Sequence, residues 1–326
     1  MRFALRRTLF YLFTAWAAIT INFVIAHSMK GDPVSAYLQK NQGKISPEAI
    51  EALRTLFGLD EEKSLWQQYL DYWQLLFSGN LGRSFSHGLA PVTDVIGTAL
   101  PWTVGLVGIA TVISFVLGTV VGAVIGWRRG RGSDAVIPVA TFFSTVPYFW
   151  MGLIAIAVFA SALGWFPASH AYGKGTRPGL TPEFVGEVLY HGALPAITIV
   201  IASLGGWILG MRNMMITVLD EDYITVAQAK GLSDRRVVTT YAARNAMLPQ
   251  LSSFALALGF IVGGTLVMEL VFSYPGIGKL LLDATNAKDY PLMQGVFLVI
   301  TLAVLFTNIL ADIAYVILDP RARQEA

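Results

Sequence analysis

The chain has 326 residues, of which 55% are hydrophobic and only 13% are charged, and its formal net charge is +2 at pH 7. Ordinary soluble domains carry about 25% charged residues, so a single water-soluble core cannot hide this apolar surface and an integral membrane protein is expected. The small net charge gives no reason to expect a nucleic-acid partner, and the absence of cysteine excludes disulfides, thiolate metal sites and cysteine nucleophiles.

Six apolar segments are long enough to cross a lipid bilayer as helices, which takes about 20 residues. Their apolar residues are continuous rather than alternating, which favours an all-α membrane protein over a barrel. The first segment is expected to be retained, because its apolar stretch exceeds the usual core of about 7–15 residues in a signal peptide. The predicted spans are 9–28, 101–126, 136–163, 193–218, 248–272 and 292–317.

The orientation follows from Lys and Arg in the short loops, which concentrate on the cytoplasmic side of a membrane. Both termini and the 220–249 segment are therefore predicted to be cytoplasmic. The basic residues of that side are Arg2, Arg6, Arg7, Arg128, Arg129, Arg131, Lys230, Arg235, Arg236, Arg244, Arg321 and Arg323. The opposite short loops hold only Lys174, Arg177, Lys279 and Lys288.

The 29–100 segment is expected to be an external element with two helices. Ser46-Pro47-Glu48 combines an N-cap, a first-turn proline and an acid, which predicts a helix that runs to about Phe57. The acidic residues 60–62 predict the start of a second helix, which ends near Gly79. Its apolar side indicates an interfacial helix packed on the bundle, with solute contact as the alternative. That side comprises Leu65, Tyr69, Tyr72, Trp73 and Leu76.

The sequence shows no pattern typical of a catalytic or cofactor site. The 164–192 segment is rich in Gly and Pro and is expected to be a loop, and the four histidines lack metal-ligand spacing. A phosphate-binding loop around Gly278 would need Gly at 273 and Ser or Thr at 280, where Ser273 and Leu280 stand. The chain is therefore expected to be no enzyme and to bind neither metal nor nucleotide.

Three charged residues lie near the ends of predicted spans, Arg212 in the fourth, Glu269 in the fifth and Asp312 in the sixth. A charge at the centre of a membrane helix costs about 2.5–3.5 kcal/mol, and such groups are presumed functional. We expect them either to hold the helices together or to contact solute.

The most informative segment is 220–249, which is charged and lies between two predicted spans. Asp220, Glu221 and Asp222 complement the positive end of a helix dipole, and Gly231 can adopt the left-handed conformation that ends a helix. Ser233 then caps a second helix, which runs towards the next span. A short crossbar helix joined to a span predicts a docking element for another protein, and a solvated amphipathic loop is the alternative. Further expected docking residues are Tyr223, Ala227, Ala229, Lys230 and Arg244.

This segment resembles the cytoplasmic EAA loop of permease subunits in bacterial binding-protein-dependent ABC importers. The matching residues are Asp222-Tyr223, Ala227, Ala229-Lys230-Gly231-Leu232, Arg244-Asn245-Ala246 and Leu248-Pro249. Relatives often have arginine where this chain has Thr225 and Gln228, which leaves the electrostatics of docking open. The wider resemblance, to the B-type permease of the dipeptide, oligopeptide and nickel group, covers nearly the whole chain. It includes Gly31-Asp32-Pro33, Gly79-Asn80-Leu81-Gly82-Arg83-Ser84, Pro147-Tyr148-Phe149-Trp150, Phe272-Ser273-Tyr274-Pro275-Gly276-Ile277-Gly278, Asp289-Tyr290-Pro291 and Leu318-Asp319-Pro320-Arg321.

The resemblance implies a type I importer permease fold in the bacterial cytoplasmic membrane. It implies three domains: the N-terminus and first span at 1–28, an external helical segment at 29–100, and a five-helix core at 101–326. The implied partners are a second homologous permease, two cytoplasmic ATPases that carry ATP and Mg, an external solute-binding protein and the lipid bilayer. The solute stays open between peptides, oligosaccharides and nickel. An ion-coupled secondary transporter is the alternative, but neither inverted repeats nor a mid-membrane ion site is visible.

Overall fold

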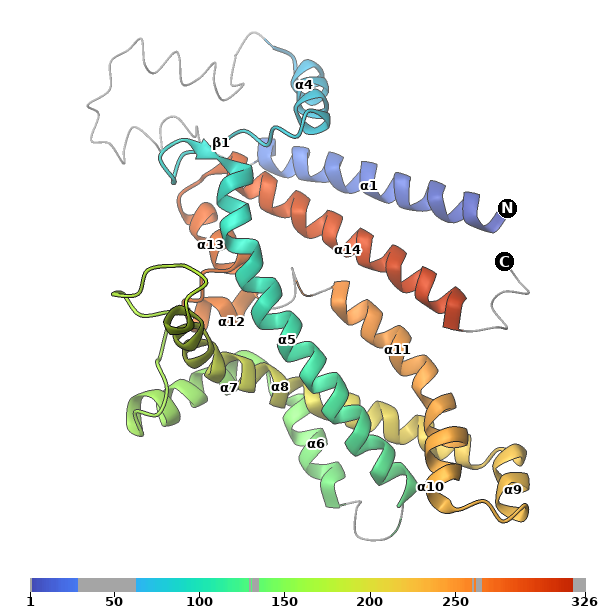
Figure 1. The fold of residues 1–326 in the computed structure, drawn as a ribbon. Coiled ribbons are helices and arrows are strands. Elements are labelled where there is room, and N and C mark those ends of the chain that lie inside the picture. Colours follow the sequence, from blue (N-terminus) through green and yellow to red (C-terminus); the bar gives the residue numbers. More distant parts are fainter. Residues whose placement is uncertain are drawn as a thin grey trace. The chain divides into compact units, whose positions relative to one another are not determined.

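The computed structural model describes residues 2–28, 63–128, 130, 135–259, 261 and 266–318, and the helix expected between Ser46 and Phe57 lies outside them. The chain divides into two compact units. Unit 1 comprises Met1–Trp102 with Pro275–Leu305, and unit 2 comprises Thr103–Tyr274 with Phe306–Ala326. Almost all of the described elements are helices (Figure 1), and two short strands form the one sheet among the described residues.

Unit 1 combines the N-terminal part of the chain with a segment that comes much later in the sequence. Its elements are α1 (Arg2–Ser28), α4 (Leu65–Phe77), β1 (Arg83–Ser84), β2 (Ala90–Pro91), the start of α5 (Val92–Trp127), α13 (Ile277–Asn286) and the first part of α14 (Tyr290–Leu318). Unit 2 contains the rest of α5 and α14 with the elements between them. These are α6 (Val136–Thr145), α7 (Tyr148–Ala155), η2 (Ile156–Ala162), α8 (Pro182–Leu219), α9 (Asp222–Ala229), α10 (Asp234–Arg236), η3 (Val237–Ala242), α11 (Ala243–Gly259) and α12 (Leu266–Val271).

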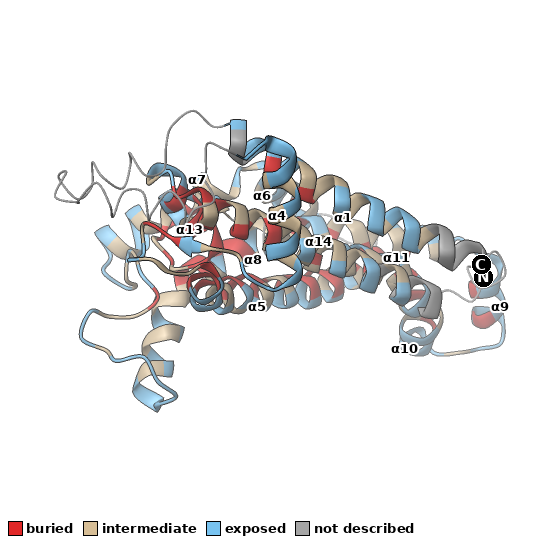
Figure 2. Ribbon diagram, turned by 90° about the horizontal axis from the view of Figure 1, so that it is seen from above, coloured by how far each residue is buried: buried red, intermediate tan, exposed pale blue. Residues whose placement is uncertain are grey.

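Four described helices, α1, α5, α8 and α14, are long and apolar enough to cross a membrane on their own. Most residues of α1 are exposed or intermediate (Figure 2), as expected of a helix that faces lipid. The predicted span 248–272 is covered by α11 and α12, but residue 260 and residues 262–265 between them lie outside the description. The count of six spans therefore stays a prediction.

The predicted third span, 136–163, is broken rather than straight. Helix α6 ends at Thr145 and α7 begins at Tyr148, and the pair is bent by 95°. Pro147 lacks a backbone N–H and forces the residue before it out of the helical region, and Val146 accordingly has an extended ψ of 127°. The predicted span is therefore built from two helical pieces that meet at this proline.

Two other membrane helices begin earlier than the apolar runs predicted. Helix α5 starts at Val92 instead of residue 101, and α8 starts at Pro182 within the segment expected to be a loop. The side chain of Thr181 caps α8 by accepting a hydrogen bond from Phe184 N, and Pro182 and Glu183 fill the first turn. Thr-Pro-Glu is a helix start signal, so polar caps rather than apolar content set this boundary.

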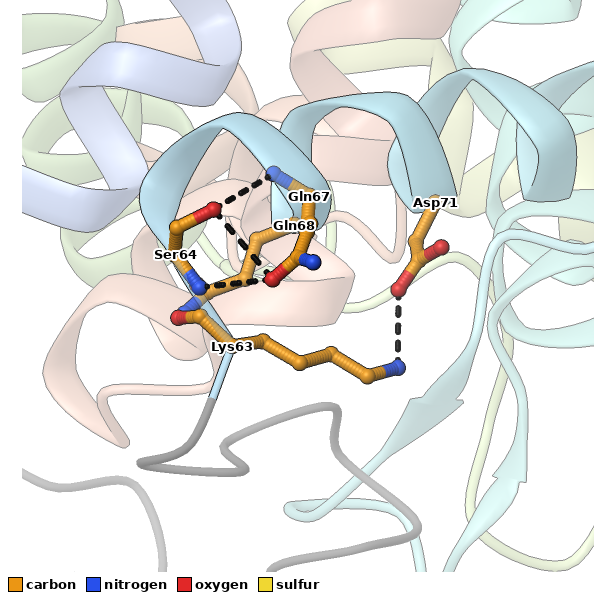
Figure 3. Close-up of polar contacts among 5 residues, drawn as sticks. All are labelled: Lys63, Ser64, Gln67, Gln68 and Asp71. Carbon is orange, nitrogen blue, oxygen red and sulfur yellow. Dashed lines mark hydrogen bonds and ion pairs between the residues drawn. The ribbon is translucent and has the colours of Figure 1, made fainter.

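Helix α4 begins at Leu65, after the acidic run 60–62 that was expected to open it. Ser64 and Gln67 form a reciprocal capping box, with Ser64 Oγ accepting from Gln67 N at 3.3 Å and Gln67 Oε1 accepting from Ser64 N at 3.0 Å (Figure 3). This satisfies two of the unpaired donors of the first turn and fixes the start. The helix ends as expected before Gly79, whose φ is +73°.

The inner side of α4 packs on α1, as its aromatic spacing predicted. Tyr69 Oη lies 2.7 Å from Thr20 Oγ1, and Tyr72 Oη accepts from Asn22 Nδ2 at 3.4 Å. Burial raises the pKa of Tyr72 to about 12, so its hydroxyl stays protonated at physiological pH. Leu65 does not belong to this side, because it is 67% exposed.

A buried carboxylate ties the hairpin of β1 and β2 to the start of α14. Asp289 Oδ2 accepts hydrogen bonds from Ser84 Oγ at 2.6 Å, Ser86 N at 2.9 Å and Ser86 Oγ at 2.7 Å. Its Oδ1 accepts from Leu292 N at 3.3 Å, in the manner of an N-cap. The bond from Ser84 to Asp289 thus joins residues 79–84 to residues 289–291, two sequence motifs that this chain shares with the family it resembles.

Helices α5 and α8 approach each other through glycines spaced four residues apart. A Cβ at Gly122 would lie 2.5 Å from Ile208 O, and a Cβ at Gly126 would lie 2.6 Å from Met215 Cβ. Gly118 lies equally close to Trp207. Membrane helices use such small residues to bring their backbones together, and this contact sets the position of the C-terminal end of α8 in unit 2.

Candidate functional site

Helix α9 is the short crossbar predicted at 220–231. It follows α8 after a turn, with Asp220 at the C-cap of α8, Glu221 at the N-cap position of α9 and Asp222 in its first turn (Figure 1). Eight residues are too few for a helix to be stable alone in water. Its stability must come from packing on the rest of unit 2.

The inner side of α9 is anchored in a hydrophobic cluster. Ile224 and Ala227 are 1% and 3% exposed, and they join residues from the end of α8 and the start of the helix that follows. The other buried members of the cluster are Met211, Met215, Val237, Ala242 and Ala246. Helix α9 is therefore packed in one cluster with α8, η3 and the start of α11.

Gly231 ends α9 in the left-handed conformation that the sequence predicted, with φ of +73°. Gly231 N donates to Gln228 O at 2.9 Å and Leu232 N donates to Ala227 O at 3.4 Å, which is the Schellman pattern. Leu232 then packs against the cluster beneath the helix. This cap both stops α9 and turns the chain towards α10.

The outer side of α9 faces solvent. Tyr223 and Val226 are 38% and 51% exposed, and Asp222, Ala229 and Lys230 are exposed as well. Tyr223, Val226 and Lys230 recur at helical spacing and form one stripe. Ala227 was expected on this contact surface, but it lies on the opposite, buried side, so its small size serves packing inside the chain.

The second helical part of the segment runs without a break into the predicted fifth span. Ser233 stands at the N-cap position, although its side chain makes no capping hydrogen bond, and α10, η3 and α11 follow one another to Gly259. Pro249, expected near the start of the span, lies inside α11. The wide turns of η3, Val237–Ala242, place an irregular helical segment directly after the crossbar, and such segments are frequent at functional sites.

A hollow of 840 Å³ separates the exposed end of α9 from η3 and α11. Tyr223 and Arg244 both line it, and Asn245 Nδ2 bridges its wall by donating to Tyr223 Oη at 2.9 Å and to Tyr241 O at 3.0 Å. Two motif segments of the sequence, around Tyr223 and around Arg244, therefore form one surface. It offers a partner an aromatic ring, a guanidinium group and a recess.

The charged residues of the predicted spans lie in different helices. Glu269 of α12 is 1% exposed and accepts a hydrogen bond from Thr103 Oγ1 of α5 at 2.6 Å, so it joins two helices of unit 2. Arg212 lies in α8 and donates to Asn213 Oδ1 at 3.4 Å, and Asp312 lies half-buried in α14. Of the two roles expected for these charges, the contact of Glu269 favours holding the helices together over contacting solute. Within the described ranges, no group of three or more His, Cys, Asp or Glu residues is arranged to hold a metal ion.

Comparisons with known proteins agree with this arrangement of elements. The model of a family described as "Binding-protein-dependent transport system inner membrane component" matches residues 118–324. The chain is 32% identical over 321 residues to the "Oligopeptide transport system permease protein AppB" of Bacillus subtilis (strain 168), covering 98% of each chain. It is 34% identical over 340 residues to the "Di/tripeptide transport system permease protein DppB" of Pseudomonas aeruginosa (strain UCBPP-PA14), covering 100% of this chain and 99% of the relative. The family match includes the whole segment from α9 to α11.

Proposed function

The chain belongs to the binding-protein-dependent transport system inner membrane component family, as a B-type permease subunit of an ABC importer in the cytoplasmic membrane, and we propose that it forms half of a translocation pathway for oligopeptides. Its fold is that of the type I importer permeases. The other half of the pathway would come from a second homologous permease. An extracytoplasmic binding protein would deliver the peptide.

The observation that carries this proposal is the construction of α9. It is a short helix with an exposed polar and aromatic outer side and an inner side anchored among residues of α8 and α11. A partner that grips the outer side moves the membrane helices through the cluster beneath. The partner proposed here is a cytoplasmic ATPase that binds ATP and Mg, one for each permease, with both permease termini on the same side of the membrane.

The solute is proposed to be a peptide rather than an oligosaccharide or nickel. Two relatives that match the chain over nearly its whole length are named as oligopeptide and di/tripeptide permeases.

The first test is uptake by proteoliposomes that contain the chain reconstituted with a second permease and two ATPases as its proposed partners. With the binding protein present, labelled tri-alanine should cross the membrane when ATP is supplied on the side where the ATPases are bound. Labelled cellotriose and Ni²⁺ should not cross under the same conditions. Accumulation driven by a proton or sodium gradient without ATP would instead support the secondary transporter. Uptake of cellotriose in place of tri-alanine would overturn the choice of solute.

A second expected result concerns Asp222, which is exposed in the first turn of α9. Asp222→Arg reverses a charge that complements the helix dipole, a contribution of about 0.3–1 kcal/mol, and places a cation on the proposed ATPase contact. Recovery of the ATPases with the purified permease should fall about fivefold, because about 1 kcal/mol corresponds to that change in an equilibrium constant.

Asp94→Arg is the matched control, since Asp94 is also an exposed acid in the first turn of a helix, α5, on the predicted external side. Its effect on ATPase recovery should be negligible. Equal losses from the two substitutions would contradict both the docking surface and the predicted orientation. Asp283, another external acid, is a poorer control because it forms an ion pair with Lys279 at 2.7 Å.

A further inference from the structure

Unit 2 contains a second hollow, of 440 Å³, bounded by three membrane helices. Each helix presents small or hydroxyl-bearing residues at intervals of three or four. They include Ser114 on α5, Ser203, Gly206 and Gly210 on α8, and Ser253 on α11, which also carries Gln250. Trp207 adds an aromatic wall, and its ring lies 5.2 Å from that of Phe115. Among the described residues that line this hollow, none has an ionisable side chain.

Gln250 is the unusual member of this set. The residue is only 7% exposed as a whole, and its amide makes no hydrogen bond to any residue in the described part of the chain. A Cβ at Gly210 would lie 2.8 Å from Gln250 Nε2, so glycine at 210 leaves the space that the amide occupies. The amide lines the hollow without a partner in the described part of the chain, so a ligand in the hollow can supply its hydrogen bonds.

The chemistry of the hollow matches a peptide group. A carboxamide offers an acceptor oxygen and two N–H donors, which pair with the N–H and C=O of a peptide unit. The hydroxyls of Ser114 and Ser253 donate to carbonyls of their own helices at 3.0 and 3.1 Å, which leaves their oxygens as acceptors. The absence of charge around the hollow suits a pathway for peptides with varied side chains, since a fixed charge would hold some peptides and repel others.

We propose that Gln250 contacts the backbone of the peptide during its passage, so that this hollow is a solute-contact site of the permease. The inference rests on the proposed function as a peptide permease. It differs from the expectation that Arg212, Glu269 or Asp312 would contact solute, because the site uses an uncharged amide. A face of small residues can also pack against a helix of the partner permease. The experiment distinguishes this helix from a peptide as the occupant of the hollow.

The test compares uptake of tri-alanine with uptake of its backbone N-methylated analogue by the complete reconstituted complex. Gln250→Met keeps the side-chain volume and removes the amide. The preference for tri-alanine over the N-methylated analogue should fall about fivefold, the effect of one lost hydrogen bond. Selection by the binding protein contributes equally to wild type and variant and cancels in the comparison.

Ser252→Ala is the control, because Ser252 lies on the same helix but outside the hollow. It should leave the preference unchanged. An unchanged preference in Gln250→Met, in a complex that transports tri-alanine normally, overturns the inference and leaves the proposed function intact. Failure of the wild-type complex to take up tri-alanine overturns both.

A second variant covers the case in which Gln250→Met does not assemble. A Cβ at Gly206 meets no atom within 4 Å, so Gly206→Leu should fold and partly fill the hollow. Assembly and ATP hydrolysis should persist while tri-alanine uptake falls at least fivefold. Loss of the partner permease from the complex would identify the hollow as a helix-packing surface and overturn the inference.

Discussion

Replacing Gly231 with valine is expected to remove the ATPases from the complex and to reduce transport at least tenfold. The φ of +73° at this position is costly for any residue with a Cβ and most costly for a β-branched one. The strain is about 1–3 kcal/mol, and it falls on an eight-residue helix that has little stability of its own. Unwinding the cap would also release the bond from Leu232 N to Ala227 O and displace the outer stripe of α9.

The measurement is the amount of ATPase recovered with the purified permease, together with ATP-driven uptake of tri-alanine. No atom lies within 4 Å of a Cβ at Gly231, so the variant introduces backbone strain without a clash. Gly79 is a matched control, since it also ends a helix with φ of +73° and also has open space at its Cβ. Gly79→Val should strain α4 in unit 1 and leave ATPase recovery near the wild-type level. If Gly231→Val retains its ATPases, α9 is not the docking element.

The crossbar was predictable because its signals are local. An acid in the first turn, a glycine at the stop and a capping position after it each act within a few residues. Which side of α9 is buried was not predictable in the same way, since the exposed Val226 is at least as apolar as the buried Ala227. The choice depends on the cluster supplied by α8 and η3, which is a tertiary contact that periodicity in eight residues cannot specify.

The helix boundaries show which sequence signals were overlooked. Thr181-Pro182-Glu183 carries the same start signal as Ser46-Pro47-Glu48, but the Gly and Pro content of 164–192 suggested a loop throughout. Pro147 stands within an apolar run and still breaks it, because a missing N–H and a clash with the preceding residue do not depend on hydrophobicity. In both places a capping or breaking residue was a better guide than apolar content.

The hollow around Gln250 could not be found from the sequence, although parts of it were visible. Gln250, Ser253 and Ala257 recur at helical spacing on α11, and Ser203, Gly206 and Gly210 do so on α8. Small residues at such intervals are common on any packed membrane helix. Only the tertiary structure shows that these faces enclose the same space and that the amide within it has no partner among the described residues.

The contact between α5 and α8 leads to the second large expected effect. Gly122→Leu would drive a side chain into Ile208 O and Met211 Cβ, which lie 2.5 and 2.8 Å from a Cβ at that position. Overpacking lowers the free energy of unfolding by about 1–3 kcal/mol and sometimes more. We expect the upper end of this range, because a backbone atom cannot relieve a clash by changing its rotamer as a side chain can. The helices must separate, and Met211 would be pulled out of the cluster that anchors α9.

The purified Gly122→Leu permease should unfold at a temperature at least about 5 °C below wild type, and what remains folded should recover less ATPase. Gly105→Leu is the control on the same helix, because a Cβ at Gly105 meets no atom within 4 Å and leucine is the better helix former. It should be as stable as wild type. Equal thermal stability of the two variants would show that the glycines of α5 do not set its distance from α8, and the route from α9 through the cluster to the membrane helices would lose its support.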